Sequence, residues 1–332
     1  MAASAFRLAL TAASGPYRAG VALRNLAFDR GWKTTYRVDV PVISIGNITL
    51  GGTGKTPMVE WVARRLRERS LRVAILSRGY GQNEGINDEG RVLEENLPDV
   101  PHLQGADRVA LARTAIEELE SQVLVLDDGF QHRRLGRDLD IVLLDALEPF
   151  GRGRIFPRGL LREPIRSLRR AGVVVLSRAD LVPESRRIGI RAEAERHAGP
   201  LPWVEAAHRP IGLLDANGNV QPLDLQGSHR VAAFCGIGNP EGFRRTLETL
   251  GTNLVGFRSF RDHHPYTARD LAEIGEWARS HGADLLLTTQ KDSVKLRVES
   301  IGSKPLRALK IGLEILKGKD ELEQKLGRVL PV

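Results

Sequence analysis

Short apolar runs, separated by polar and glycine-containing segments, recur through most of this chain. Strands are predicted at residues 42–45, 72–77, 123–126, 141–145, 173–176, 231–234 and 284–287. A short continuous apolar run bounded by turn residues is typical of a strand buried on both faces of a sheet. Segments between these runs, such as 58–63 and 107–119, are predicted as helices. This alternation predicts an α/β fold with a mostly parallel sheet flanked by helices.

The first apolar run leads into a glycine-rich turn. The turn reads Thr49-Leu50-Gly51-Gly52-Thr53-Gly54-Lys55-Thr56. Glycines let backbone N–H groups surround phosphate oxygens, and the helix that follows directs its positive end at the same anion. In such a P-loop the lysine reaches the β- and γ-phosphates and the final hydroxyl holds Mg²⁺. The strict motif has glycine where this chain has Thr49, but the strand before and the helix after complete the context. The sequence therefore predicts a nucleoside triphosphate site.

The apolar run at 123–126 ends in two adjacent carboxylates, Asp127 and Asp128. An acidic residue at the tip of a hydrophobic strand, downstream of a P-loop, is the Walker-B arrangement, in which the carboxylate holds Mg²⁺. A plain turn also favours Asp-Asp-Gly. The four apolar residues before it and the P-loop upstream favour the metal role.

Composition limits the classes of protein that this chain belongs to. It has 332 residues, 42% hydrophobic and 27% charged, so a packed core is expected. The single cysteine, Cys235, excludes a disulfide framework and a thiolate metal cluster. No apolar run approaches the roughly 20 residues of a membrane-spanning helix, and Arg7 interrupts the only signal-like segment. These features predict a cytoplasmic protein.

The net charge of +8 indicates an anionic partner. Nucleic acid is the weakest candidate, because aromatic residues make up only 5% and do not alternate with basic ones. An anionic membrane surface and a phosphorylated substrate fit better. No pattern identifies a protein partner.

Residues 17–30 predict a basic amphipathic helix that begins after Pro16. Its apolar residues are Tyr17, Val21, Leu23, Leu26 and Phe28. Its basic residues are Arg18, Arg24 and Arg30, and Lys33 and Arg37 follow the helix. Two interpretations are open: the helix packs on the core of the protein, or it binds a membrane surface.

Several motifs together resemble the tetraacyldisaccharide 4′-kinase family of lipid A biosynthesis. They lie at residues 41–47, 54–57, 77–81, 105–108, 127–132, 161–164, 262–264 and 291–292. The resemblance implies transfer of the γ-phosphate of ATP to the 4′-hydroxyl of a tetraacylated glucosamine disaccharide 1-phosphate, with ATP and Mg²⁺ as cofactors. It also implies a peripheral position on the cytoplasmic face of the inner membrane of a Gram-negative-type bacterium. Threonine in place of the first P-loop glycine is itself similar to the family pattern.

The resemblance also implies roles for individual residues. Asp88 is implied to be the catalytic base and His263 its partner, and Glu163 to join Thr56, Asp127 and Asp128 around the metal. Residues implied to hold substrate or phosphate groups are Arg78, Arg108, Gln131, His132 and Arg162. Three local departures from the family pattern are Asn87-Asp88-Glu89-Gly90, where the family has Gly-Asp-Glu-Pro, Leu160, where it has proline, and Gln290, where it has glutamate.

We therefore expect a P-loop kinase that acts on a lipid-linked sugar. The expected domains are a basic N-terminal helical segment (1–38), a P-loop kinase core (39–200), a linker or β-ribbon (201–228), and a smaller C-terminal α/β domain that contributes to the active-site cleft (229–332). The alternatives are a soluble small-molecule kinase and a GTPase switch or metallochaperone. Asp180 fits the GTPase alternative, but an intact N-K-x-D motif is absent from the sequence.

Overall fold

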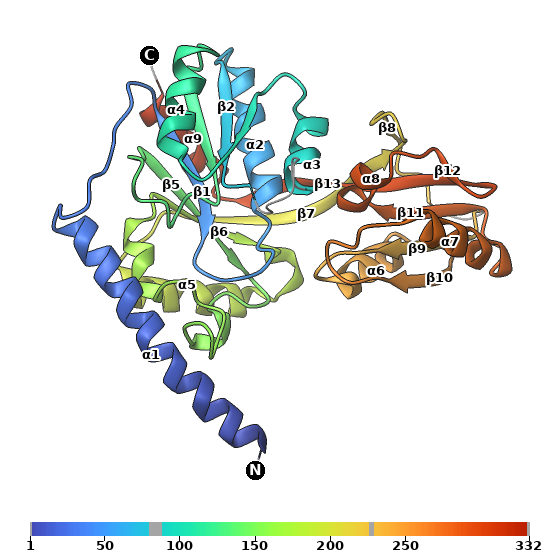
Figure 1. The fold of residues 1–332 in the computed structure, drawn as a ribbon, viewed down its shortest axis with the longest axis horizontal. Helices are drawn as coiled ribbons and strands as arrows, with labels where there is room; N and C mark the ends of the chain where they lie inside the picture. The colour runs from blue at the N-terminus through green and yellow to red at the C-terminus, as the bar shows by residue number, and fades with distance from the viewer. Residues whose placement is uncertain (1, 80–87, 226–228, 331–332) are drawn as a thin grey trace. The chain divides into compact units, whose positions relative to one another are not determined.

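A computed structural model describes residues 2–79, 88–225 and 229–330 of the chain (Figure 1). Asn87 and, from the 77–81 motif, Tyr80 and Gly81 lie outside the described residues. Two compact units are formed. The first unit contains residues 1–80, 99–208 and 313–332, and the second contains residues 81–98 and 209–312.

The first unit contains a parallel sheet in the order β7-β6-β5-β1-β4-β2-β3. Its strands are β1 (Val42–Asn47), β2 (Val73–Ser77), β3 (His102–Gln104), β4 (Val123–Asp127), β5 (Leu139–Asp145), β6 (Val173–Ser177) and the first part of β7 (Trp203–Leu214). Central strands β1, β2 and β6 are buried along their whole length, as their continuous apolar runs predict. The predicted α/β class and the parallel sheet are confirmed.

The first unit also contains several helices. They are α1 (Ala2–Asp29), α2 (Lys55–Glu68), α4 (Arg108–Glu117), α5 (Glu184–Ala198) and α9 (Lys319–Val329), with 3₁₀ turns η1 (Gly151–Gly153), η2 (Ile165–Arg170) and η3 (Ala179–Leu181). Helix α2 packs on β1 and β4, and α4 packs on β2 and β3 (Figure 1). The core beside α5 joins Ile190 and Ala194 to Val174 and Leu176 of β6.

The second unit contains a smaller parallel sheet in the order β10-β9-β11-β13. Its strands are β9 (Val231–Cys235), β10 (Leu254–Ser259), β11 (Leu285–Thr289) and the first part of β13 (Lys304–Lys317); β8 (Val220–Gln221) pairs antiparallel with the end of β7, and β12 (Ser300–Ile301) with β13. Its helices are α3 (Asp88–Asn96), α6 (Pro240–Thr249), α7 (Ala268–Ser280) and α8 (Gln290–Leu296). Strands β7 and β13 each run from one unit into the other.

Helix α3 differs from what the sequence predicts, because the polar composition of residues 82–103 favours irregular structure. Within its described part, residues 88–96 are helical and His102–Gln104 form β3. Asp88 and Glu89 occupy the first turn of α3, where the helix dipole favours negative charge. Leu93 is buried, and the helix packs on α8. Tertiary contacts therefore stabilise a helix that its polar composition does not predict.

Helix α1 also differs from the prediction, because it begins at Ala2 and runs through Pro16 (Figure 1). Proline removes one backbone hydrogen bond inside a helix. The residues before it are rich in alanine and leucine, which have high helix propensity. The side chain of Ser14 bonds back to the carbonyl of Leu10 and also to that of Ile155. Alanine-rich sequence and contacts with the core extend the helix past its proline.

Three basic or polar side chains hold the buried carboxylate of Glu163. Arg170 donates to it at 2.9 Å, Asn25 at 2.9 Å, and Arg24 at 3.4 Å. Arg24 and Asn25 lie on α1, so this cluster anchors the C-terminal half of α1 to the first unit. Burial alone would raise the pKa of Glu163, but Arg170 and the hydrogen bonds outweigh it and hold that pKa below its usual value.

Replacing Glu163 by alanine is expected to lower the free energy of unfolding by about 3 kcal/mol, because two partly buried guanidiniums lose their counter-charge. Urea denaturation followed by circular dichroism measures this loss. The matched control is Glu248→Ala, which removes an exposed pair with Arg244 and should cost less than about 1 kcal/mol. Equal losses in the two variants would contradict the anchoring role.

Candidate active site

The predicted P-loop connects β1 to α2 in the first unit. Gly51 and Gly54 adopt left-handed φ angles of 110° and 85°, which favour glycine. A Cβ atom at Gly54, the N-cap of α2, would lie 2.4 Å from the ring of His208. Both the backbone angle and the close approach therefore require glycine here. The turn and the helix start that phosphate binding needs are both present.

Side chains outside the motif brace this loop. The amide of Asn47 donates to the Thr53 hydroxyl at 3.0 Å, and the Ser177 hydroxyl donates to the Thr53 carbonyl at 2.8 Å. The guanidinium of Arg178 donates to the Gly52 carbonyl at 3.0 Å. Sequence reasoning missed these three residues and His208. Asn47 and Ser177 each end a parallel strand, β1 and β6, and this position at the carboxyl edge of the sheet was the available signal.

The first two predicted loop residues take different positions. Thr49 is buried and forms a bridge with Leu161, whereas the Leu50 side chain is 41% exposed. The Leu50 N–H donates to the carbonyl of Leu160 at 2.7 Å. The segment at 160–161 therefore holds the entry to the loop.

Asp127 ends β4 and lies beside Ile45 of β1 in the parallel register. The carboxylate of Asp128 is 2.7 Å from the Arg162 guanidinium and 3.7 Å from the Lys55 ammonium. Burial alone would raise the pKa of Asp128, but these two cations outweigh it and hold that pKa below its usual value. The structure thus brings Lys55, Asp128 and Arg162 together.

The donor set at this site suits Mg²⁺, which prefers oxygen ligands and commonly keeps several of its waters. Thr56 supplies a hydroxyl in the first turn of α2, and Asp127 and Asp128 supply carboxylates at the end of β4. Across the described ranges there is no group of three or more His, Cys, Asp or Glu side chains that could hold a metal. Glu163 binds Arg170 and α1 instead, so its metal role stays a prediction.

Other predicted residues gather near the ends of β1 and β4. Arg108 is buried and donates to the Asp127 carbonyl at 3.4 Å. Gln131 donates to the Asn47 carbonyl at 2.9 Å, and Arg162 also contacts the Asn47 side chain at 3.3 Å. Arg78 is exposed and directly follows β2.

His132 and His208 are held neutral in the first unit. Burial, together with the charge of Arg108, lowers the pKa of His132 to about 4. Burial, together with the charge of Arg178, lowers the pKa of His208 to about 4. Each imidazole is therefore uncharged at neutral pH.

The second unit brings together the two predicted catalytic residues. The Nδ1 atom of His263 is 3.0 Å from Oδ2 of Asp88, at the start of α3. His263 has a left-handed φ of 58°, which is strained for a residue other than glycine. Its backbone N–H donates to the carbonyl of Gly236 at 3.1 Å. These residues are separated by 175 positions in the sequence, and the fold of this unit makes them a pair.

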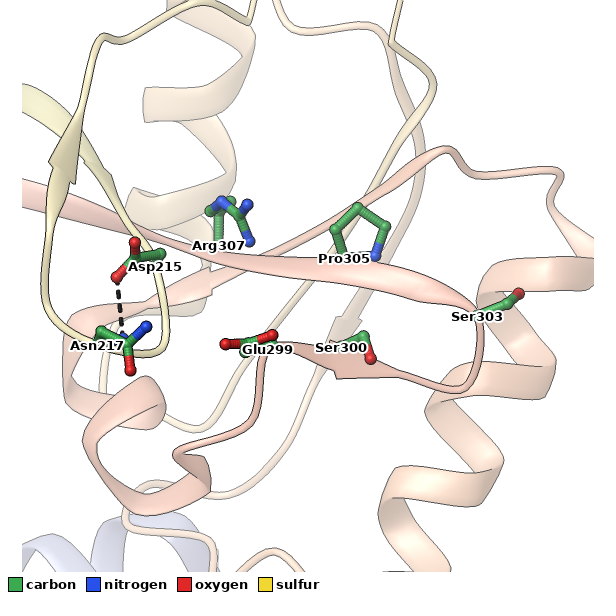
Figure 2. Close-up of a pocket in the computed structure, with 7 residues that line it drawn as sticks. All are labelled: Asp215, Asn217, Glu299, Ser300, Ser303, Pro305 and Arg307. Atoms are coloured by element: carbon green, nitrogen blue, oxygen red, sulfur yellow. Dashed lines mark hydrogen bonds between the residues drawn. The ribbon is translucent and has the colours of Figure 1, made fainter.

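An open polar cleft of about 430 Å³ also lies in the second unit. Figure 2 shows its lining, with the Asp215 carboxylate accepting from the Asn217 backbone. Its lining includes Glu299 and Arg307 but none of the residues predicted to take part in catalysis.

The parallel sheet, the P-loop and the Lys55–Asp128 cluster define an α/β P-loop protein with a candidate phosphate site. A family model described as tetraacyldisaccharide-1-P 4′-kinase matches residues 6–331. The chain belongs to this family, as the motifs predicted. The GTPase or metallochaperone alternative was therefore wrong.

Named relatives and a solved structure agree with this assignment. The chain is 44% identical to the tetraacyldisaccharide 4′-kinase of Anaeromyxobacter dehalogenans, over 96% of this chain and 89% of the relative. It is 41% identical to that of Geobacter sulfurreducens, over 93% and 90% of the two chains. It is also similar to the ATP complex of LpxK from Aquifex aeolicus, with a TM-score of 0.78, 30% identity, and coverage of 98% and 100%.

The lowered pKa values of the partly buried His132 and His208 predict a loss of stability in mild acid. An unfolded histidine has a pKa of about 6.5, so between about pH 6.5 and 4 the unfolded chain binds more protons than the folded one. Stability is then complete above about pH 6.5 and falls as the pH drops toward 4. For His208 the loss is on the order of 3 kcal/mol.

Urea denaturation of the wild type and of His208→Gln between about pH 7.5 and 5 measures this effect. The variant should show a shallower pH dependence. His229→Gln, at an exposed position, is the matched control and should keep the wild-type slope. A wild-type slope in His208→Gln would show that this imidazole is protonated equally in both states.

Proposed function

We propose that this chain transfers the γ-phosphate of ATP to the 4′-hydroxyl of a tetraacylated glucosamine disaccharide 1-phosphate at a membrane surface. The observation that carries this assignment is the 3.0 Å contact between Asp88 and His263, in a family of 4′-kinases whose P-loop this chain retains. Phosphoryl transfer needs stabilisation of the phosphate charge and a group that accepts the hydroxyl proton. The first unit supplies the phosphate site and the second supplies the acid–base pair.

Residues 49–56 hold the triphosphate through backbone N–H groups, and Lys55 contacts its β- and γ-phosphates. In the structure Lys55 faces Asp128, so the lysine exchanges part of this contact for phosphate when ATP binds. Arg162 then remains with Asp128 and keeps that carboxylate paired. Thr56, Asp127 and Asp128 are the residues proposed to hold Mg²⁺, which neutralises phosphate charge when bound.

Asp88 accepts the proton of the acceptor hydroxyl as the oxygen attacks phosphorus. His263 orients the carboxylate through its Nδ1 contact. General base catalysis of this kind is worth about 10² to 10⁴ in rate. Arg78, Arg108 and Arg162 suit the anionic groups of the substrate. Neutral His132 and Gln131 suit sugar hydroxyls, which both donate and accept hydrogen bonds.

The surface of the first unit near α1 supports a peripheral membrane site on the cytoplasmic face of the inner membrane. Leu23 is 65% exposed and Trp32 is 70% exposed, next to exposed Arg18 and Arg30. Phe28 instead packs under the Arg133 guanidinium, with 5.2 Å between the guanidinium and the ring centroid. In the described part of the chain, no helix is both long and apolar enough to cross a bilayer. The helix therefore docks on the unit by one face and offers another face for the membrane.

Activity on the lipid disaccharide tests the proposal directly. With labelled ATP and the tetraacylated disaccharide 1-phosphate, the wild type should place label in the lipid fraction. Lys55→Met and Asp127→Asn should each lower that transfer by about a hundredfold or more, because each contact strengthens in the transition state. Lys319→Met, at the exposed start of α9, is the control and should keep wild-type transfer. Near-normal transfer in either site variant would contradict the assignment of the phosphate site.

The Asp88–His263 pair is expected to act as one unit. Asp88→Ala and His263→Ala should each lower kcat, and the double variant should cost much less than the product of the two single losses. Steady-state rates of the four proteins measure the coupling. If the losses multiply, or if Asp88→Ala keeps wild-type kcat, the base lies elsewhere.

Vesicle binding tests the membrane surface. The wild type is expected to co-sediment with anionic vesicles and to dissociate at high salt, because each cation near the surface contributes about 1 kcal/mol and is screened. Leu23→Ser combined with Trp32→Ser should weaken binding. Val220→Ser, at an apolar residue 53% exposed in the second unit, is the matched control. Salt-independent binding, or unchanged binding in the double variant, would contradict this surface.

A further inference from the structure

Two lysines of α8 contact the Asp88–His263 pair, and the proposed chemistry does not yet use them. The ammonium of Lys291 is 3.2 Å from Nε2 of His263. The ammonium of Lys295 is 3.6 Å from Oδ2 of Asp88. Both lysine side chains are largely buried, at 22% and 12% exposed. Each member of the pair therefore faces one cation of the same short helix.

The chemistry of these contacts selects one form of the imidazole. Nε2 of His263 lies 3.2 Å from the Lys291 ammonium and 3.9 Å from the Asp262 carboxylate, so Lys291 is its hydrogen-bond partner. A lysine ammonium only donates hydrogen bonds, so Nε2 must offer its lone pair to Lys291. An ionised Asp88 only accepts, so Nδ1 of His263 must carry the proton that it donates. The two neighbours impose the same requirement from opposite sides of the ring. His263 is then neutral and protonated on Nδ1.

Acidic neighbours keep Lys291 in place and charged. Its ammonium is 3.1 Å from Glu89 and 3.3 Å from Asp262. Burial opposes the charged form, but these two carboxylates outweigh it and raise the pKa of Lys291 above its usual value. Lys291 therefore remains a donor at neutral pH.

The rest of α8 fixes the positions of the two partners. Asp292 is fully buried and accepts from the Gly236 N–H at 2.9 Å, and the Gly236 carbonyl accepts from the N–H of His263. Lys295 also bonds Asp292, at 3.0 Å. Gln290 exchanges amide hydrogen bonds with Asn96, at the opposite end of α3 from Asp88. One helix thus holds both the backbone and the side chains of the pair.

We infer that Lys291 and Lys295 are positioning residues for the phosphotransfer: Lys291 fixes His263 as the neutral tautomer protonated on Nδ1, and Lys295 holds the Asp88 carboxylate beside it. This inference rests on the proposed role of the Asp88–His263 pair. It assigns proton acceptance to Asp88, because the lone pair of His263 is directed to Lys291. Both of these contacts to Asp88 are made by its Oδ2 atom.

The tautomer is directly measurable in the wild-type protein. Nitrogen-15 NMR of histidine-labelled protein at about pH 8, with the His263 signals assigned from a His263→Gln sample, distinguishes the protonated ring nitrogen from the unprotonated one. We expect Nδ1 to carry the proton. A wild-type His263 protonated on Nε2 would overturn the inference without any variant.

Substitution of Lys291 adds a kinetic readout. Lys291→Met is expected to lower kcat by about ten- to a hundredfold with an unchanged KM for ATP, and to mix the two His263 tautomers. Lys291→Arg keeps a donor and should restore the Nδ1–H tautomer with part of the rate. Lys304→Met, at the start of β13 in the same unit, is the matched control. Wild-type kcat and wild-type nitrogen shifts in Lys291→Met would contradict the inference.

Failure of the inference is distinguishable from failure of the proposed pair. If Asp88→Ala keeps wild-type kcat, the pair is not catalytic and the lysines lose their role with it. If Asp88→Ala is inactive while Lys291→Met keeps wild-type kcat and tautomer, only the positioning role is wrong. If Lys291→Met does not fold, the tautomer of His263 in the wild type and the kcat of Lys291→Arg still test the positioning role of Lys291.

Discussion

The first unit depends on the ion pairs of the Asp128 carboxylate, which is largely buried at 15% exposed. This carboxylate lies between Lys55, at the start of the P-loop helix, and Arg162, on the loop that pairs with Thr49. An unpaired charge at this depth is costly, so the two cations and the carboxylate keep these segments together. The neighbouring Glu163 is buried and binds Arg24 and Asn25 of α1. Adjacent residues of one loop therefore hold the phosphate site and the N-terminal helix.

The second unit also pairs carboxylates with cations, but in a different arrangement. Asp88, Glu89, Asp262 and Asp292 place several carboxylates close together, and the lysines of α8 offset that charge. The same contacts direct the imidazole of His263 toward Asp88. Electrostatic stability and the geometry of the proposed catalytic pair therefore come from one set of ion pairs. In the proposed function, the first unit stabilises charge on the phosphate and the second accepts the proton of the hydroxyl.

Much of this structure could be predicted because its signals are local. The apolar run at 123–126 predicts the buried strand β4, and the glycines at 51, 52 and 54 predict the turn that opens α2. The kinase family could be identified because many short motifs occur in one order. The position of Lys55 beside Asp128 follows from the parallel pairing of β1 with β4.

Features that depend on distant contacts could not be predicted. Helix α3 has a polar composition and is held by α8, whose Gln290 bonds Asn96 from 194 positions away. The partners of Glu163 on α1 lie 138 and 139 positions away in the chain, so these hydrogen bonds could not be predicted from the sequence. His208 carries no motif, yet its ring fixes the glycine at position 54. The contact between Phe28 and Arg133 distinguishes the packed side of α1 from its exposed side, and the sequence of the helix alone does not.

The central claim is that the two units divide the reaction, with ATP held by the first and the hydroxyl activated by the second. Equilibrium dialysis of labelled ATP tests this claim most directly, in Lys55→Ala and in the Asp88→Ala/His263→Ala double variant. We predict that Lys55→Ala loses most of its ATP affinity, whereas the double variant binds ATP as the wild type does. Equal losses of ATP affinity in both proteins would contradict the division.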